Sequence, residues 1–184
     1  NLAPHATGFD ADRTAFGGLA TTPTFGFPNQ LQAIAVKGTR AYLPNTSASP
    51  EAPVKFDVDT QAFLGVIDTT TNQELGAFNV SLNLAVKQHT ATPKLFLAVP
   101  WAAAFENGSN DGYVVSSASN VVAKITRAGN GQPSVVSDNV TGGTRVRGIG
   151  VGKNPQGLVI ASNDRRAYVM NYVSRDVSVI DLTR

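Results

Sequence analysis

Residues 154–184 read NPQGLVIASNDRRAYVMNYVSRDVSVIDLTR, and this stretch decides the fold. Pro155 and Gly157 are typical of a turn. Three short apolar runs follow, separated by polar turns: LVIA (158–161), AYVMN (167–171) and VSVIDL (177–182). Such runs predict three antiparallel β-strands. The last run carries apolar residues on both faces, as expected of a strand whose sheet packs between two other sheets.

The same order of strands and turns recurs earlier in the chain, which indicates a repeat architecture. Residues 28–80 contain four matching runs: AIAV (33–36), AYLPN (41–45), LGVID (64–68) and LGAFNV (75–80). An insertion at 47–61, with two prolines and several charges, is expected to be an exposed loop. The sequence therefore predicts one complete four-stranded unit over 28–80.

A fainter copy is predicted within 81–152. Its four strands are expected at 82–86, 95–100, 120–126 and 144–152. A long excursion, residues 101–119, separates the second strand from the third. Variable spacing between copies is compatible with a repeat, because insertions in surface loops cost little free energy.

The last copy resembles the YVTN repeat of bacterial β-propellers. In that pattern a P-x-G turn precedes an apolar strand, a polar turn, a Y-V-x-N strand and a V-x-V-I-D strand. The matching residues are Pro155, Gly157, Tyr168, Val169, Asn171, Val177, Val179, Ile180 and Asp181. The first copy keeps Tyr42, Asn45, Val66, Ile67 and Asp68, with Leu43 and Pro44 inside its signature. The middle copy keeps only the strand pattern.

The resemblance implies an all-β fold, a β-propeller of four-stranded antiparallel blades. The predicted division is an N-terminal extended segment (1–27), a blade (28–80), a blade with long insertions (81–152) and a blade lacking its outer strand (153–184). A propeller closes with four to eight blades. We therefore expect about three blades of a ring of about six or seven, completed by further sequence of the same or another chain.

Composition argues against several functional classes. The formal net charge is +2 and no run of Lys and Arg exceeds two residues, so nucleic-acid binding is not expected. The chain has no cysteine, which excludes disulfides, thiolate metal sites and covalent c-type haem attachment within it. No run of about 18 apolar residues exists, so no membrane span is predicted.

Few residues suggest catalysis. The two histidines, His5 and His89, are too few for an imidazole metal cluster, and a surface role is favoured for each. The Gly-rich stretch GIGVGKNPQG (148–157) lacks the Ser or Thr that follows Lys in a phosphate-binding loop. It is therefore interpreted as the turn between two blades, and no catalytic residue is predicted.

One loop is rich in side-chain oxygens. The string NGSNDG (107–112) makes Asn107, Asn110 and Asp111 candidate Ca²⁺ ligands. It lacks the spacing of an EF-hand loop and its distal Glu, so a plain loop is favoured. The acidic residues of the first insertion, Glu51, Asp57 and Asp59, invite the same interpretation.

Trp101 and Phe105 lie in the apolar part of the 101–119 excursion. Packing beneath a loop is the favoured interpretation. The alternative is an aromatic anchor for a partner, because aromatic residues are enriched at interface hot spots.

The leading functional hypothesis is a non-catalytic binding or scaffold segment of an exported bacterial propeller protein. The resemblance implies an extracytoplasmic location, in the periplasm or at the cell surface. Binding would use the loops at 47–61, 101–119 and 128–143. The alternative is the propeller part of a larger oxidoreductase or electron-transfer protein, because YVTN blades also occur joined to haem domains of the di-haem peroxidase kind; the haem would then lie in further sequence.

Overall fold

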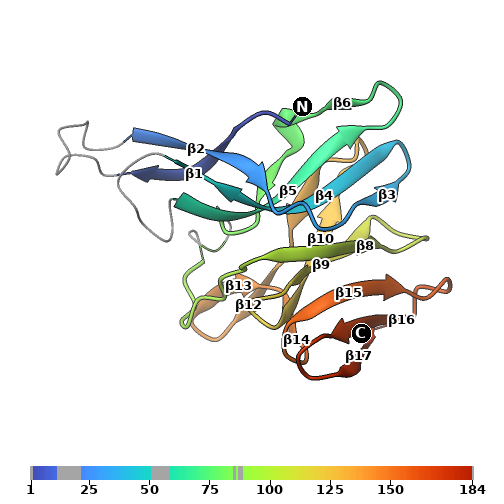
Figure 1. Ribbon diagram of the computed structural model, residues 1–184. Coiled ribbons are helices and arrows are strands. Elements are labelled where there is room, and N and C mark those ends of the chain that lie inside the picture. Colours follow the sequence, from blue (N-terminus) through green and yellow to red (C-terminus); the bar gives the residue numbers. More distant parts are fainter. Residues whose placement is uncertain (1, 12–21, 51–58, 85, 87–88, 184) are drawn as a thin grey trace.

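The computed structural model describes residues 2–11, 22–50, 59–84, 86 and 89–183. This part of the chain consists mainly of short β-strands in antiparallel sheets, so the all-β class predicted from the sequence is confirmed. The three largest sheets follow one another in chain order (Figure 1). Within the described residues, none of the helices has the length and apolar character needed to cross a bilayer.

The first sheet has seven strands. They are β1 (His5–Ala11), β2 (Thr22–Asn29), β3 (Ala35–Lys37), β4 (Arg40–Ala48), β5 (Thr60–Asp68), β6 (Gln73–Glu74) and β7 (Val80–Ser81). The centre is the long β4–β5 pair, with β3 and β2 on opposite ends of β4. Strands β3, β4 and β5 overlap the first three strands predicted for 28–80. The N-terminal segment contributes the β1–β2 hairpin.

The predicted fourth strand at 75–80 is wrong in detail. The outer edge of β5 is covered in two pieces, β6 and β7, with a short 3-10 helix η2 (Gly76–Phe78) between them. The backbone N–H of Val66 donates a hydrogen bond of 2.7 Å to the side-chain Oδ1 of Asn79. A side chain therefore takes the place of one ladder acceptor, and the strand is interrupted there.

The second sheet corrects the prediction for 81–152. Its strands are β8 (Pro100–Phe105), β9 (Asp111–Ser116), β10 (Val121–Arg127), β11 (Pro133–Val135) and β14 (Gly148–Gly150). The excursion 101–119 is thus no loop, because it contains β8 and β9. Residues 82 and 83 form a turn, and residues 95–98 are irregular, so neither segment is the predicted strand. Three consecutive alanines in β8 have low β-propensity, which hid this strand from the sequence pattern.

The third sheet matches the prediction closely. Its strands are β15 (Pro155–Ile160), β16 (Arg166–Asn171) and β17 (Asp176–Asp181), each paired antiparallel with the next. The turn residues Asp164 and Arg175 adopt positive φ angles of 57° and 60°, which tight reversals require. A separate hairpin, β12 (Ser137–Val140) with β13 (Gly143–Val146), lies in the chain between β11 and β14 of the second sheet.

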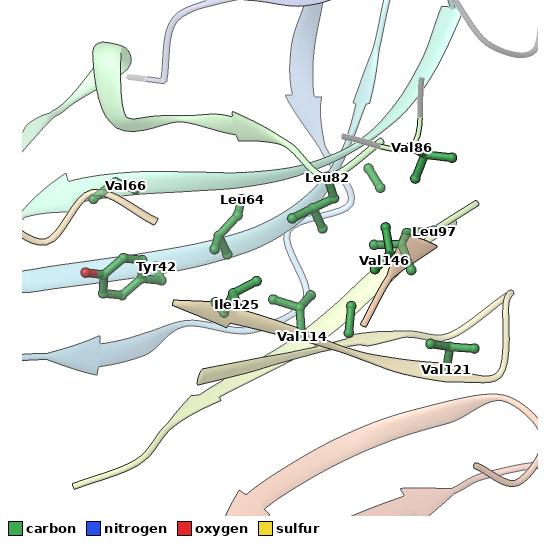
Figure 2. Close-up of a cluster of buried hydrophobic side chains, with 12 residues drawn as sticks. Tyr42, Leu64, Val66, Leu82, Val86, Leu97, Val114, Val121, Ile125 and Val146 are labelled. Atoms are coloured by element: carbon green, nitrogen blue, oxygen red, sulfur yellow. The ribbon is translucent and has the colours of Figure 1, made fainter. Parts of the chain in front are cut away.

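Two apolar clusters hold the sheets together. The first joins the first and second sheets (Figure 2) and contains Tyr42, Ala62, Leu64, Val66, Leu82, Val86, Leu97, Val114, Val121, Ala123, Ile125 and Val146. The second joins the second and third sheets and contains Ala102, Tyr113, Val115, Val122, Ala167, Val169 and Ile180. Neighbouring residues of β9 and β10 alternate between the clusters, as the strand period requires. The second sheet is therefore buried on both faces.

Candidate functional site

Residues 107–112 cover the β8–β9 turn and the first two residues of β9, and the turn contacts the third sheet. The carboxylate of Asp164, in the β15–β16 turn, accepts backbone hydrogen bonds from Asn107 (2.8 Å) and Gly108 (2.7 Å). These bonds lower the pKa of Asp164, Asn107 contributing most. The side-chain amide of Asn107 donates to the carbonyl of Ser162 at 3.2 Å. Asn107 therefore holds two sheets together.

The first sheet contacts the same turn from the other side. The Lys37 ammonium donates to the carbonyls of Glu106 (2.6 Å) and Asn107 (2.8 Å). The turns β3–β4, β8–β9 and β15–β16 all point to one side of the molecule (Figure 1). We call this the laced end, defined by Lys37, residues 106–108 and Asp164. Polar contacts there connect all three sheets.

The other calcium candidates face cations. A carboxylate oxygen of Asp111 lies 2.6 Å from the ammonium nitrogen of Lys124, and Oδ1 of Asn110 accepts a hydrogen bond from Arg127 at 3.3 Å. In the described part of the chain, no three His, Asp or Glu side chains are grouped as metal ligands would be. Calcium binding at this loop stays a prediction. Glu51 and Asp57 lie outside the described residues.

The surface role expected for the two histidines is wrong. His5 is 9% exposed and lies over the ring of Phe63, with Nε2 2.8 Å from a carboxylate oxygen of Glu74. His89 is 7% exposed, and its Nε2 lies 2.7 Å from the hydroxyl of Ser137. Sequence neighbours gave no signal of this burial, because the covering residues are distant along the chain.

Acidification is expected to destabilise the protein through His89. Burial, with a further contribution from Lys94, lowers the pKa of His89 below its ordinary value of 6.5. The unfolded chain therefore binds the proton more readily, so stability is full above about pH 6.5 and falls as the pH drops below it. We expect the melting temperature to fall less on acidification in His89→Gln than in the wild type. An equal fall in both would contradict the assignment.

Trp101 and Phe105 both pack inside the molecule. The ring of Phe105 lies against Tyr42 of the first sheet, with 4.5 Å between ring centroids. Trp101 packs against the cluster between the second and third sheets. A shift in the β8 register near Ala102 lets these residues serve different clusters. The structure accounts for both rings by internal packing, and partner binding through them stays a prediction.

One face of the third sheet is open. Its apolar side chains are 37% to 59% exposed: Val159, Tyr168, Met170, Val177 and Val179. We call this set the open face. The opposite face of the same sheet is buried against the second sheet through Ala167 and Val169. Contiguous exposed apolar side chains are a general feature of protein interaction surfaces.

In the first and second sheets, the tyrosine that corresponds to Tyr168 of the open face is covered by the next sheet. In each sheet a tyrosine lies on the middle one of three consecutive strands: Tyr42 on β4, Tyr113 on β9 and Tyr168 on β16. Tyr42 and Tyr113 face the next sheet along the chain, and Tyr168 faces the corresponding side of the third sheet. Tyr42 is 0% exposed beneath the second sheet and Tyr113 is 3% exposed beneath the third. Tyr168 is 37% exposed. The sequence reasoning missed Tyr113, although DGYVVS and RAYVMN share the same spacing to the strand that follows.

The chain matches no protein-family model and no curated protein. Among solved structures it is similar to Kuenenia stuttgartiensis hydrazine synthase, with a TM-score of 0.62 and 12% identity over 89% of this chain and 48% of that one. The fold is propeller-like. A functionally unknown protein from Desulfotomaculum acetoxidans DSM 771 matches 87% of this chain and 59% of its own at 10% identity, with a TM-score of 0.34. The chain thus spans about half of each match.

Within the described residues, no further strand pairs with the outer edge of the third sheet, which is strand β17. Strand β17 pairs with β16 on one side only. A cleft of about 630 Å³ lies between β17 and the outer part of the second sheet, with Ile149 and Val151 on one wall and Ile180 and Leu182 on the other. An unpaired strand edge presents free backbone N–H and C=O groups, so it can accept a further strand.

Proposed function

We propose that this chain is a binding or scaffold segment of a larger β-propeller of the YVTN kind. In this proposal the three sheets are successive blades, and a further blade packs on the open face. The exposure of Tyr168, against the burial of Tyr42 and Tyr113, carries the proposal. A ring of about six or seven blades would place such a blade there in the same or another chain. The extracytoplasmic location is part of the proposal.

Two internal interfaces support this assignment. The aromatic ring of Phe105, on the first strand of the second sheet, covers Tyr42. Leu158 and Ile160, on the first strand of the third sheet, pack against the cluster that contains Tyr113. A further blade with an apolar first strand would cover Tyr168 in the same way. A fourth strand beside β17 would fill the cleft and pair the free edge.

Association of the chain tests the proposal. Because the open face is apolar, we expect the average mass in sedimentation to rise with concentration. Tyr168→Asp is expected to weaken this association about tenfold or more, because a charge must then be buried without a partner. Ile34→Asp is a matched control at an exposed apolar side chain in the segment between β2 and β3, away from the open face. Equal effects of both variants, or a strictly monomeric wild type, would count against the open face as an interface.

A second candidate is a structural part of an oxidoreductase. The likeness to a chain named as hydrazine synthase, which is an enzyme by its name, is the observation that favours it. The 184 residues contain no cysteine, so a covalently attached c-type haem would belong to other sequence. A Soret absorbance band in the protein purified from its native source would support this candidate, and its absence would favour the scaffold role.

A further inference from the structure

The peptide group that joins Asn107 to Gly108 lies between two charged side chains at the laced end. Its N–H, from Gly108, donates to a carboxylate oxygen of Asp164 at 2.7 Å. Its carbonyl, from Asn107, accepts from the Lys37 ammonium at 2.8 Å. Asn107 and Gly108 are both exposed, so water reaches this peptide group. An anion and a cation thus contact the two ends of one exposed peptide group.

The dipeptide Asn–Gly can react with itself, because glycine has no side chain to hinder attack by its nitrogen. The backbone nitrogen of the glycine loses its proton and attacks the side-chain carbonyl carbon of the asparagine. A C–N bond forms, the side-chain nitrogen leaves as ammonia, and a succinimide ring remains. Water then opens the ring at either carbonyl and gives aspartate or isoaspartate. Each conversion consumes a water molecule and releases a molecule of ammonia.

Asp164 opposes the first step of this reaction at Asn107. The Gly108 nitrogen must lose its proton, and the resulting anion would lie beside the Asp164 carboxylate. Like charges in contact disfavour the ionised form of the group that titrates. The backbone hydrogen bond from Asn107, followed by that from Gly108, lowers the pKa of Asp164, so this carboxylate is ionised at neutral pH. The N–H of Gly108 is therefore protected while Asp164 accepts from it.

A second restraint acts on the side chain that would be attacked. The side-chain nitrogen of Asn107 donates to the carbonyl of Ser162 at 3.2 Å. The attack brings the side-chain carbonyl carbon of Asn107 to the Gly108 nitrogen, so this hydrogen bond must be released. Ser162 and Asp164 both lie in the β15–β16 turn. Both restraints therefore come from the third sheet.

Lys37 acts in the opposite sense. The negative charge of a deprotonated peptide nitrogen is shared with the carbonyl oxygen of the same group. The Lys37 ammonium lies 2.8 Å from that oxygen and stabilises the charge. Lys37 belongs to the first sheet, so its contact does not need the third. Movement of the β15–β16 turn away from Asn107 would remove both restraints and leave Lys37 in place.

We propose that Asn107 is a deamidation site whose reaction rate is controlled by Asp164. The side chain is protected while the third sheet contacts the β8–β9 turn, and it converts to aspartate or isoaspartate when that contact opens. The product carries a carboxylate that repels Asp164 and cannot donate to Ser162. Deamidation therefore weakens the laced end permanently. This proposal does not depend on the assignment of the sheets as propeller blades.

The full chain tests the proposal in mildly alkaline buffer, with the conversion at Asn107 followed by peptide mass spectrometry. The variant is Asp164→Asn, which keeps the shape of the side chain and suits the positive φ angle of 57° at this position. We expect the conversion rate at Asn107 to rise about tenfold, as the loss of one charge-assisted hydrogen bond implies. In urea, where the contact is absent, both proteins should convert at equal rates.

The second Asn–Gly dipeptide, Asn130–Gly131, is a control within the same molecule. The Gly131 N–H donates to the neutral carbonyl of Ala128 at 2.9 Å, so the rate at Asn130 should not change in Asp164→Asn. Unfolding of the variant would raise both rates together.

Asp181→Asn is the matched control variant. It makes the same substitution on the third sheet, at a carboxylate that accepts from Thr183, and should leave the rate at Asn107 unchanged. An unchanged rate at Asn107 in Asp164→Asn would overturn the proposal. An equal rise at Asn130, a similar rise in Asp181→Asn, or a difference that persists in urea would overturn it as well.

Discussion

Leu64→Ala is expected to lower the free energy of unfolding by about 2–5 kcal/mol. Leu64 is fully buried on β5, in the middle of the cluster between the first and second sheets (Figure 2). Removing its branched side chain loses the burial of its methyl groups and leaves a cavity that rigid strands on both sides cannot fill. Urea denaturation followed by circular dichroism measures the change.

The matched control for Leu64 is Ile34→Ala. Ile34 is 61% exposed, so its truncation is expected to change stability by no more than about 0.5 kcal/mol. Similar losses in both variants would mean that the packing between the first two sheets contributes little. A loss confined to Leu64→Ala would show that these sheets share one core.

Asn171→Ala is expected to cost about 2–3 kcal/mol. Asn171 is 1% exposed, and its side-chain amide donates to the Asp176 carboxylate at 2.7 Å and to the Ser178 hydroxyl at 2.8 Å. It also lies so close to Gly152 that a Cβ there would come within 2.6 Å of it. Alanine would remove both donors and leave a gap beside the segment that links the second and third sheets.

Met170→Ala provides the comparison for Asn171. Met170 is the preceding residue of β16, but it lies on the open face and is 47% exposed. Its loss is expected to affect stability much less, and to weaken association in the same way as Tyr168→Asp. Equal destabilisation by the two alanine variants would contradict the alternation of buried and exposed residues in β16.

Local sequence patterns predicted the third sheet well. Its three apolar runs are separated by turns rich in Asn, Asp and Ser, and their signal does not depend on distant residues. The apolar character of both faces of 177–182 also predicted a surface for another sheet, and the open face has that character. The function of that face stays a proposal.

The second sheet was predicted poorly for two physical reasons. The alanine-rich β8 has little intrinsic preference for a strand, and packing against both neighbouring sheets decides its structure. By contrast LFLAV (95–99) has a strand-like composition but is held irregular by Asn83 and Ser116. These contacts join residues 14 and 18 positions apart, so no local pattern contains them.

The candidate sites depend on still longer contacts. Asp164 meets Asn107 across 57 positions, and this contact gives the oxygen-rich loop a structural partner that the sequence did not indicate. A cavity of about 240 Å³, lined among others by Thr46, Ala62 and Leu97, needs β4, β5 and the segment 96–99 together. Sequence alone therefore indicated the residue types of the oxygen-rich loop but not their neighbours, and it did not indicate the cavity.

The laced end connects the three sheets on one side of the molecule. The backbone of residues 106–108 is bonded from one side by Lys37 and from the other by Asp164, and these bonds fix the separation of the sheets at this end. At the opposite end, the side chain of Asn83, which follows β7 of the first sheet, makes two hydrogen bonds to Leu97, which precedes β8 of the second sheet. The first two sheets are therefore joined at both ends of their interface, and we expect them to unfold as one unit.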